Sequence, residues 1–331
     1  MEHTDFNRIE AELIGYKVFE LLNRESNTLK SHSVFDHAIY MHDDEDNFIK
    51  IIKDKEFVSP TSIVISGMEN LSFKSMDIQD GTQIEFIKDQ ITSKEGEFSL
   101  YFGNALTWQL PKFPKESEII SLEQINLNLR ILKDIIYTSL SREGLVPLLE
   151  NVEKLGPLEV FVKNQKPTMS EKARPYIDAL MWGILSGDIK TIKSSAGSIL
   201  GLGPGLTPSC DDFIAGLILS LNTASTSLCR NEPKAVEFFE KMSEELAALA
   251  KEKTTIYSSW FISESAIGEG PKAALELIFS IISNSPEKVS AISKELISVG
   301  ATSGADTAIG IYYGIRFLTS RLELSDLNEF E

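Results

Sequence analysis

A glycine-rich loop that leads directly into an apolar helix is the strongest constraint in this sequence. Residues 201–213 read Gly-Leu-Gly-Pro-Gly-Leu-Thr-Pro-Ser-Cys-Asp-Asp-Phe, with three glycines in five positions. Glycine costs conformational entropy and is kept where the backbone turns sharply or lets another group come close. We expect Thr207 to be the N-cap of the helix and Pro208 its first residue. Asp211 and Asp212 then lie in the first turn, where negative charge complements the helix dipole.

A second copy of this pattern lies near the C-terminus. Residues 209–216 and 303–310 share Ser, Asp and Gly at the first, fourth and eighth positions. An Asp and a Gly four residues apart lie on one face of a helix, and a glycine face lets another backbone approach closely. Two interpretations stay open: both segments are Ser-x-x-Asp helix caps, or the two helix N-termini converge on one polar site.

The loop lacks the features of the standard nucleotide-phosphate loops. It matches neither Gly-x-x-x-x-Gly-Lys-Ser/Thr nor Gly-x-Gly-x-x-Gly. It contains no lysine or arginine, and its two prolines remove two backbone donors. A nucleotide-phosphate cradle of either kind is therefore not expected.

Three segments of the chain resemble one bacterial family. They are the loop at 201–213, the Gly-x-Thr-Ser-Gly-x-Asp segment at 300–306, and the His-Ser-Val-Phe segment at 32–35. These segments are similar to the family, long described as a domain of unknown function, that includes the AllH subunit of oxamate carbamoyltransferase. The resemblance extends over residues 28–316, with the glycine loop as its most specific part. Residues 253–258 are similar to a further family segment with a basic residue, a threonine and a following serine.

Two positions depart from the family pattern. Cys210 stands where the family usually has glycine, and Ala301 stands where it often has histidine. A thiol at a helix N-terminus is sometimes an activated nucleophile, but because related proteins have glycine there, we do not expect this role for Cys210. Alanine offers no side-chain chemistry at position 301.

The resemblance implies participation in oxamate carbamoyltransferase. That reaction cleaves oxalurate with phosphate to give oxamate and carbamoyl phosphate, from which a carbamate kinase makes ATP during anaerobic purine or allantoin catabolism. The family is one of three components, so we expect a transferase subunit that requires companion subunits and acts on a small anionic ureido substrate and phosphate. The alternatives are a noncatalytic partner-binding subunit and a stand-alone metal-dependent hydrolase of a small ureido or acyl compound.

The expected site combines two aspartates with the polar groups around them. Acyl transfer requires oxyanion donors and correct positioning of the substrate. Asp212 and Asp306 are the expected catalytic residues, accepting hydrogen bonds from ureido N–H groups or holding a cation such as Mg²⁺. The expected substrate-binding residues are Gly203, Gly205, Thr207, Ser209, Asp211, Thr302, Ser303, Gly304, Lys253, Thr255 and His32. The Ser-Thr-Arg-Thr phosphate loop of ordinary carbamoyltransferases is missing, so this is an unrelated solution or companion subunits supply the phosphate site.

The four histidines, at positions 3, 32, 37 and 42, lie early in the chain. The five-residue steps from His32 to His37 to His42 place successive side chains on opposite sides of a strand. The Cys/His spacing of a zinc site is also missing, so a metal trio is not expected. We keep His32 as a candidate hydrogen-bond donor near the domain interface, with a purely structural histidine as the favoured alternative. Lys253 and Arg174 are candidate anion contacts, with a role in solvating the surface or complementing the helix dipole as the alternative.

The charge balance restricts the class of partner. The chain has 32 Lys and Arg residues against 49 Asp and Glu, a net charge of −17, which argues against nucleic acid or an anionic membrane as the main partner. Two cysteines do not make a disulfide framework. The first residues lack the hydrophobic core of a signal peptide, and no apolar run approaches the ~20 residues of a membrane span. We therefore expect a soluble, cytoplasmic protein.

The residue pattern changes near the prolines at 111 and 114. Before them, the runs at 48–52, 62–66 and 83–87 are short, β-branched and bounded by turn residues. After them, apolar spacings of three and four predict helices at 122–140, 170–185, 208–221, 234–250, 272–282 and 306–318. We expect an α+β protein: an antiparallel β-rich domain at 1–115 with a short N-terminal helix, then a mainly α-helical domain at 116–331 that carries both Gly/Ser/Asp motifs.

Overall fold

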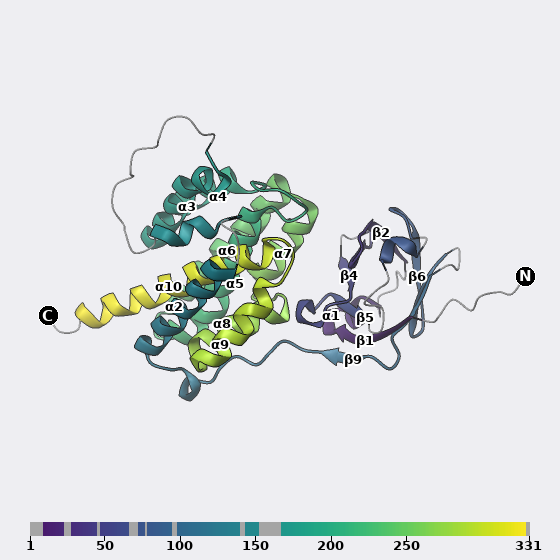
Figure 1. The fold of residues 1–331 in the computed structure, drawn as a ribbon, viewed down its shortest axis with the longest axis horizontal. Helices are drawn as coiled ribbons and strands as arrows, with labels where there is room; N and C mark the ends of the chain where they lie inside the picture. The colour runs from purple at the N-terminus through teal and green to yellow at the C-terminus, as the bar shows by residue number, and fades with distance from the viewer. Residues whose placement is uncertain are drawn as a thin grey trace, which may run out of the picture. The chain divides into compact units, whose positions relative to one another are not determined.

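The computed structural model describes residues 9–22, 28–44, 47–65, 72–76, 78–94, 98–139, 143–151 and 167–328. The chain divides into two compact units, Met1–Pro111 and Lys112–Glu331 (Figure 1). The first unit is built on a β-sheet and the second on helices. The α+β class that the sequence predicts is therefore confirmed.

The N-terminal unit is a sheet that closes on itself. Its described strands are β1 (Ile9–Gly15), β2 (Thr28–Val34), β3 (Ala38–His42), β4 (Phe48–Ile52), β5 (Ser62–Ile65), β6 (Gln83–Ile87), β7 (Gln90–Ser93), β8 (Ser99–Tyr101) and β9 (Leu106–Trp108). They pair in the order β5-β4-β3-β2-β6-β7-β8-β1, and β5 also pairs with β1, so these eight form a barrel, with β9 added against β1. A short helix, α1 (Tyr16–Leu22), follows β1, whereas we expected a short helix ahead of the strands.

The sheet is mixed, whereas we expected an antiparallel one. β1 runs parallel to β8 and β9, and β4 runs parallel to β5. Strand direction depends on the crossover between strands, which the alternation of side chains along one strand does not reveal. The strands themselves follow the pattern: β4 and β6 have the predicted bounds, and β5 falls within 62–66.

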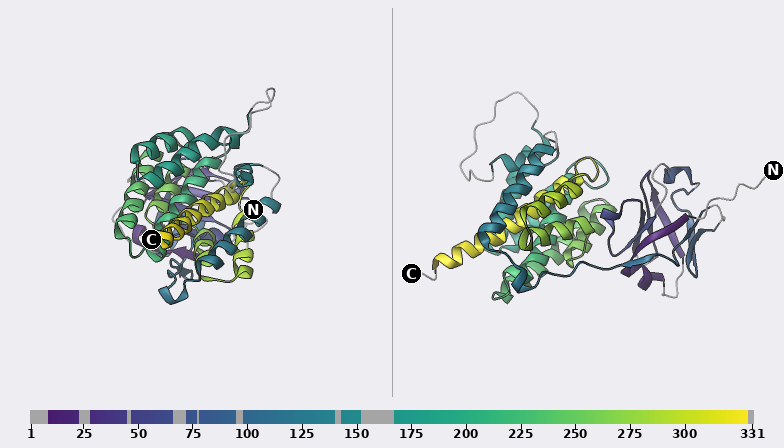
Figure 2. Two further views of the ribbon diagram at one scale, coloured as in Figure 1. Left: turned by 90° about the vertical axis from the view of Figure 1, so that its left-hand side faces the viewer. Right: turned by 60° about the horizontal axis from the view of Figure 1, so that its bottom comes forward.

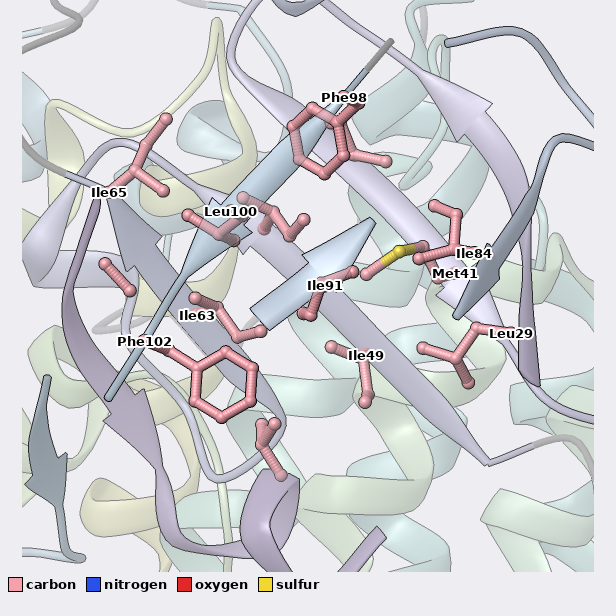
Figure 3. Close-up of a cluster of buried hydrophobic side chains, with 14 of the residues drawn as sticks. Leu29, Met41, Ile49, Ile63, Ile65, Ile84, Ile91, Phe98, Leu100 and Phe102 are labelled. Atoms are coloured by element: carbon pink, nitrogen blue, oxygen red, sulfur yellow. The ribbon is translucent and has the colours of Figure 1, made fainter. Parts of the chain in front are cut away.

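Apolar side chains from successive strands fill the interior of the barrel (Figure 3). Along β3 the burial alternates, with Ile39 and Met41 buried and their neighbours partly exposed. Full burial of one such side chain contributes about 1.5–3 kcal/mol. The residues labelled in this cluster are Leu29, Met41, Ile49, Ile63, Ile65, Ile84, Ile91, Phe98, Leu100 and Phe102.

The C-terminal unit is helical. Its described α-helices are α2 (Leu122–Ser139), α3 (Met169–Ser186), α4 (Ile189–Ile199), α5 (Ser209–Leu228), α6 (Pro233–Lys253), α7 (Ile256–Ala266), α8 (Lys272–Ser283), α9 (Pro286–Ile297) and α10 (Ser303–Asn328). Short 3-10 helices η3 (Glu116–Glu118) and η4 (Val146–Asn151) accompany them. The six predicted helices are present with shifted ends, while α4, α7 and α9 were not predicted. Among the helices described, none is both long and apolar enough to span a lipid bilayer.

Helix α5 is the centre of this unit. Every residue from Ser209 to Ser225 is buried, and α6, α7, α8 and α10 all pack on it. The most extensive contact is with α10, which is drawn in yellow and crosses the helical unit in both views of Figure 2. A Cβ atom added to Gly216 would lie 2.1 Å from the carbonyl oxygen of Thr307, and one added to Gly310 would lie 2.1 Å from that of Phe213. The predicted glycine faces thus bring the two backbones together.

Candidate functional site

The first turns of α5 and α10 meet side by side. The Thr207 hydroxyl oxygen lies 3.1 Å from Ser303 Oγ, and Ser209 Oγ lies 3.5 Å from the hydroxyl oxygen of Thr302. Of the two interpretations left open for the repeated motif, the structure therefore has the second, in which the two helix N-termini converge. We call this group the Ser/Asp cluster, consisting of Thr207, Ser209, Asp212, Thr302, Ser303 and Asp306.

Partners within the Ser/Asp cluster are exchanged between the two helices. The hydroxyls of Ser303 and Thr207 act on the Asp212 carboxyl, and those of Ser209 and Thr302 act on the Asp306 carboxyl. Each motif serine therefore serves the aspartate of the other motif. The expectation that Thr207 caps α5 is wrong: the residue before α5 is Pro208, which provides no side-chain cap, and the Thr207 hydroxyl turns to Ser303 instead.

Both aspartates of the cluster are buried, with Asp212 at 2% exposure and Asp306 at 0%. Burial raises the pKa of Asp212 well above its ordinary value, and the neighbouring Asp306 carboxyl adds to the rise. Burial also raises the pKa of Asp306, to about 6, against hydrogen bonds that lower it. The charged forms are disfavoured because a carboxylate loses its hydration on burial.

One carboxyl oxygen of each aspartate lacks a partner. Asp212 Oδ2 and Asp306 Oδ2 are buried and accept no hydrogen bond from the described residues. An unsatisfied buried acceptor costs about 1–3 kcal/mol. A proton, a donor group of a ligand or a cation at this point would remove that cost.

The glycine loop adopts backbone conformations that favour glycine. The φ angles are 79° at Gly201, 137° at Gly203 and 92° at Gly205, all in the left-handed region. A Cβ atom on Gly203 would lie 2.4 Å from the backbone nitrogen of Ser209, whereas one on Gly205 would meet nothing within 4 Å. Gly203 thus packs against the start of α5, and Gly205 lies at an exposed tip.

Asp211 anchors this loop. Its Oδ1 accepts a hydrogen bond from the Gly201 backbone N–H at 2.8 Å, and its Oδ2 accepts one from the Thr254 hydroxyl. Thr255 attaches the loop a second time, because its hydroxyl donates to the Leu206 carbonyl at 2.6 Å. Since Asp211 is 1% exposed and both its oxygens are bonded, we assign it to the loop anchor and not to the substrate surface where we expected it.

The structure also places two further expected residues, Gly304 and Lys253. The Gly304 backbone N–H donates to the Val299 carbonyl at 3.1 Å, so it is engaged within the chain and is not an oxyanion donor. A Cβ atom at this position would lie 1.9 Å from the Leu296 carbonyl, so Gly304 serves packing. Lys253 is exposed at the end of α6, and its carbonyl oxygen would lie 3.1 Å from a Cβ on Gly201.

The histidines belong to the N-terminal unit. His32 lies on β2, with its Nδ1 3.1 Å from Ser33 Oγ. Its ring is 5.9 Å from that of His42, because β2 and β3 are antiparallel neighbours that pair Lys30 with His42. Our argument placed successive histidines on opposite sides of one strand, but the chain turns between β2 and β3, so His32 and His42 lie on neighbouring strands and His37 lies on neither. His37 is exposed between the two strands, and His3 lies outside the described residues.

One contact to the Ser/Asp cluster was not predicted from the sequence. The Leu145 backbone N–H donates to Asp306 Oδ1 at 2.8 Å. The preceding residue, Gly144, has a φ of 59°. A glycine in Glu-Gly-Leu ahead of an apolar stretch is the one signal that marked this turn, and it does not reveal its partner. Thr254 was also missed, although it stands within the segment that resembles the family.

Cys210 lies in a buried setting close to two carboxyls. Its thiol is fully buried. Burial raises its pKa far above the ordinary value, and the carboxyls of Asp211 and Asp306 raise it further. The expectation that Cys210 is not a nucleophile agrees with this environment, because nucleophilic thiols need a lowered pKa.

The ligand atoms that the cluster offers to a cation are all oxygens, which hard ions prefer. These are Asp212 Oδ2, Asp306 Oδ2 and the neighbouring hydroxyls of Thr207, Ser209, Thr302 and Ser303. Mg²⁺ binds such oxygens, but it would compete with the protons that the raised pKa values of both carboxyls favour. The same acceptors suit N–H donors equally well.

Comparison with known protein families gives a separate match for each of the two units. The sequence model described as oxamate carbamoyltransferase subunit AllH matches residues 199–315, which carry the glycine loop and the whole Ser/Asp cluster. The model described as the AllH family N-terminal domain matches residues 9–107. Together the matches span about two thirds of the chain. No solved structure matches the chain. The chain belongs to the AllH family of oxamate carbamoyltransferase subunits.

Proposed function

We propose that this chain binds the carbamoyl donor in an oxamate carbamoyltransferase complex. The reaction is the conversion of oxalurate and phosphate to oxamate and carbamoyl phosphate, in anaerobic purine or allantoin catabolism. The observation that carries the proposal is the pair of buried acceptors, Asp212 Oδ2 and Asp306 Oδ2, at the junction of two helix N-termini. The family match supports the reaction class and the need for companion subunits.

The ureido group fits the unsatisfied acceptors. Its N–H groups would donate to the two Oδ2 atoms, while the anionic end of the substrate would lie near the positive ends of α5 and α10. Gly203 and Gly205 contribute backbone N–H groups, for which the described residues provide no acceptor. Thr207 and Ser303 are partly exposed, so their hydroxyls connect the buried carboxyls with the surface.

The reaction requires a proton transfer that the cluster suits. A phosphate oxygen forms a bond to the ureido carbon, the bond from that carbon to the amide nitrogen breaks, and the proton of hydrogen phosphate must reach the departing nitrogen. A carboxyl with a pKa of about 6 exchanges protons readily near neutral pH. We assign this transfer to Asp306 and the hydrogen-bonding of the carbamoyl group to Asp212. Companion subunits supply the cations that bind phosphate.

The test is carbamoyl phosphate formation by the reconstituted complex. Asp212→Asn and Asp306→Asn keep the side-chain shape and remove the acid, so we expect activity to fall about a hundredfold or more. The matched control is Asp188→Asn, because Asp188 caps α4 through the Lys190 and Thr191 backbone N–H groups and is exposed. Complex assembly is followed by size-exclusion chromatography.

Normal turnover by both cluster variants in an intact complex would contradict the proposal. The pair would then be a helix-joining device, and the chain a noncatalytic subunit that binds its partners. The isolated chain is also assayed, and we expect little or no activity without companions. Full turnover by the isolated chain would show that it carries the phosphate site as well.

A further inference from the structure

A turn from outside both matched segments closes over Asp306. Residues 143–145 precede η4 and lie between the two family matches. A Cβ atom on Gly144 would stand 2.6 Å from Asp306 Oδ1 and 2.9 Å from Oδ2. The next residue, Leu145, donates its buried backbone N–H to Oδ1. The turn therefore packs directly on the carboxyl and occupies one of its two oxygens.

Arg174 of α3 holds this turn in place. Its Nη2 donates to the Pro147 carbonyl at 3.0 Å. Pro147 is the second residue of η4, which begins directly after Leu145 and packs against α2, α3 and α10. The Val146 N–H donates back to the Glu143 carbonyl at 3.3 Å, so the turn and η4 move together. Loss of the Arg174 contact would therefore shift the Leu145 N–H relative to Asp306.

We propose that Arg174, acting through the Gly144–Leu145 turn, is a positioning residue for Asp306. The turn engages Oδ1, while Oδ2 accepts no hydrogen bond from the described residues. The inference rests on the proposed function, in which Asp306 moves a proton. Arg174 contacts Pro147 of η4, and we assign it this positioning role in place of that of an anion contact.

The turn also affects the acidity of Asp306. The Leu145 hydrogen bond favours the carboxylate and lowers the pKa of Asp306 against the effect of burial. Within the described residues, the titratable groups whose pKa values the Asp306 carboxyl raises are Asp212 and Cys210, both on α5, and Asp211 of the same helix raises the pKa values of both as well. A variant that shifts the turn should therefore raise the pKa of Asp306, without any change in charge next to the carboxyl.

The test compares Arg174→Met with Arg174→Lys, which keeps a donor for the Pro147 carbonyl. Lys172→Met is the matched control, because Lys172 is an exposed cation on the same helix. In the reconstituted complex we expect Arg174→Met to lower kcat about tenfold or more with little change in KM. The pH–rate profile of Arg174→Met should move to higher pH by about half a unit or more. Arg174→Lys should restore most of the lost kcat and most of the natural pH–rate profile.

A second measurement does not depend on activity. Carbon NMR of Asp-labelled chain, with Asp306→Asn to assign the resonance, follows the titration of Asp306 directly. We expect its midpoint to rise in Arg174→Met, or in Arg174→Gln if the Met variant does not fold. An unchanged titration would overturn the inference, even if kcat falls. If Asp306→Asn is active in the complex, and the Asp306 midpoint nevertheless rises in Arg174→Met, then Arg174 positions Asp306 but the proposed function is wrong.

Discussion

The start of α5 and the start of α10 carry the same motif in different surroundings. The Asp212 carboxyl is served by the hydroxyls of Ser303 and Thr207, while the Asp306 carboxyl receives hydroxyls and, in addition, a backbone N–H from Leu145. The pKa of Asp306 is raised to about 6, and that of Asp212 is raised well above its ordinary value. The repeated motif thus yields two buried carboxyls with different hydrogen-bond partners, because a segment outside the motif contacts one of them.

The second motif position also differs between the two helices. Cys210 fills it in α5 and is fully buried, whereas in α10 it is Gly304, whose Cβ position lies 1.9 Å from the Leu296 carbonyl. The space beside α5 accepts a side chain, but the space beside α10 is occupied by backbone. The motif therefore preserves the polar positions and the helix contact, and the second position adapts to its neighbours.

The largest expected effect is on the contact that joins the two helices. Gly310→Ala would place a methyl group 2.1 Å from the Phe213 carbonyl, a backbone atom that cannot move unless α5 and α10 separate. Overpacking in a core typically costs ~1–3 kcal/mol, occasionally more, and this contact falls at the upper end. We expect a loss of about 3 kcal/mol in the free energy of unfolding, measured by urea titration.

The matched control for this substitution is Gly197→Ala in α4. There the new methyl group would lie 3.5 Å from Leu249 Cδ2, an ordinary contact. Replacement of a helical glycine by alanine stabilises by up to ~1 kcal/mol. Equal effects of the two substitutions would mean that the helices do not approach as closely as the structure has them.

The next effect concerns the pH dependence of stability. The pKa of Asp306 is about 6 in the folded chain against 3.8 ordinarily, so its contribution is complete below about pH 4 and is lost as pH rises through 6. The loss reaches about 3 kcal/mol, from about 1.4 kcal/mol per pKa unit. Asp306→Asn should remove this loss and therefore gain stability over the natural chain between pH 4.5 and 7.5.

Asp212→Asn sharpens the comparison between the two carboxyls. Because the pKa of Asp212 is raised well above its ordinary value, the natural chain should gain the same kind of pH dependence from this residue. Urea titrations at several pH values, with Asp188→Asn as the control, measure how much Asp212 and Asp306 each contribute to the pH dependence of stability. Parallel pH profiles for the natural chain and for Asp306→Asn would refute the assigned burial effect.

The local part of this architecture could be predicted from the sequence. The Ser-x-x-Asp-x-x-x-Gly spacing indicates a helix start and a glycine face, because both depend on residues within two turns. The exchange of partners could not be predicted, because Ser303 and Asp212 meet only in the folded chain. The same reason explains the error at Thr207, whose hydroxyl finds Ser303 and not its own helix.

Long-range contacts account for the features that sequence patterns missed. Leu145 is 161 residues from its partner Asp306, and no periodicity links the two. The parallel pairing of β4 with β5 depends on how the chain returns to the sheet. The unpredicted helix α7 begins at a cap, Thr255, whose hydroxyl also holds the glycine loop.

The smallest expected effect tests the second motif position. Cys210→Ala removes one buried sulfur atom, and we expect a loss of about 1 kcal/mol in stability with turnover of the complex within about twofold of normal. Cys229→Ala is the matched control, since Cys229 is also buried and burial raises the pKa of its thiol to about 11. Neither thiol should react with iodoacetamide in the folded chain at pH 8, because the thiolate is the reactive form. A stable Cys210→Ala variant with a tenfold loss of turnover, beside a normal Cys229→Ala, would instead place the thiol in the chemistry and distinguish the two helix starts by function.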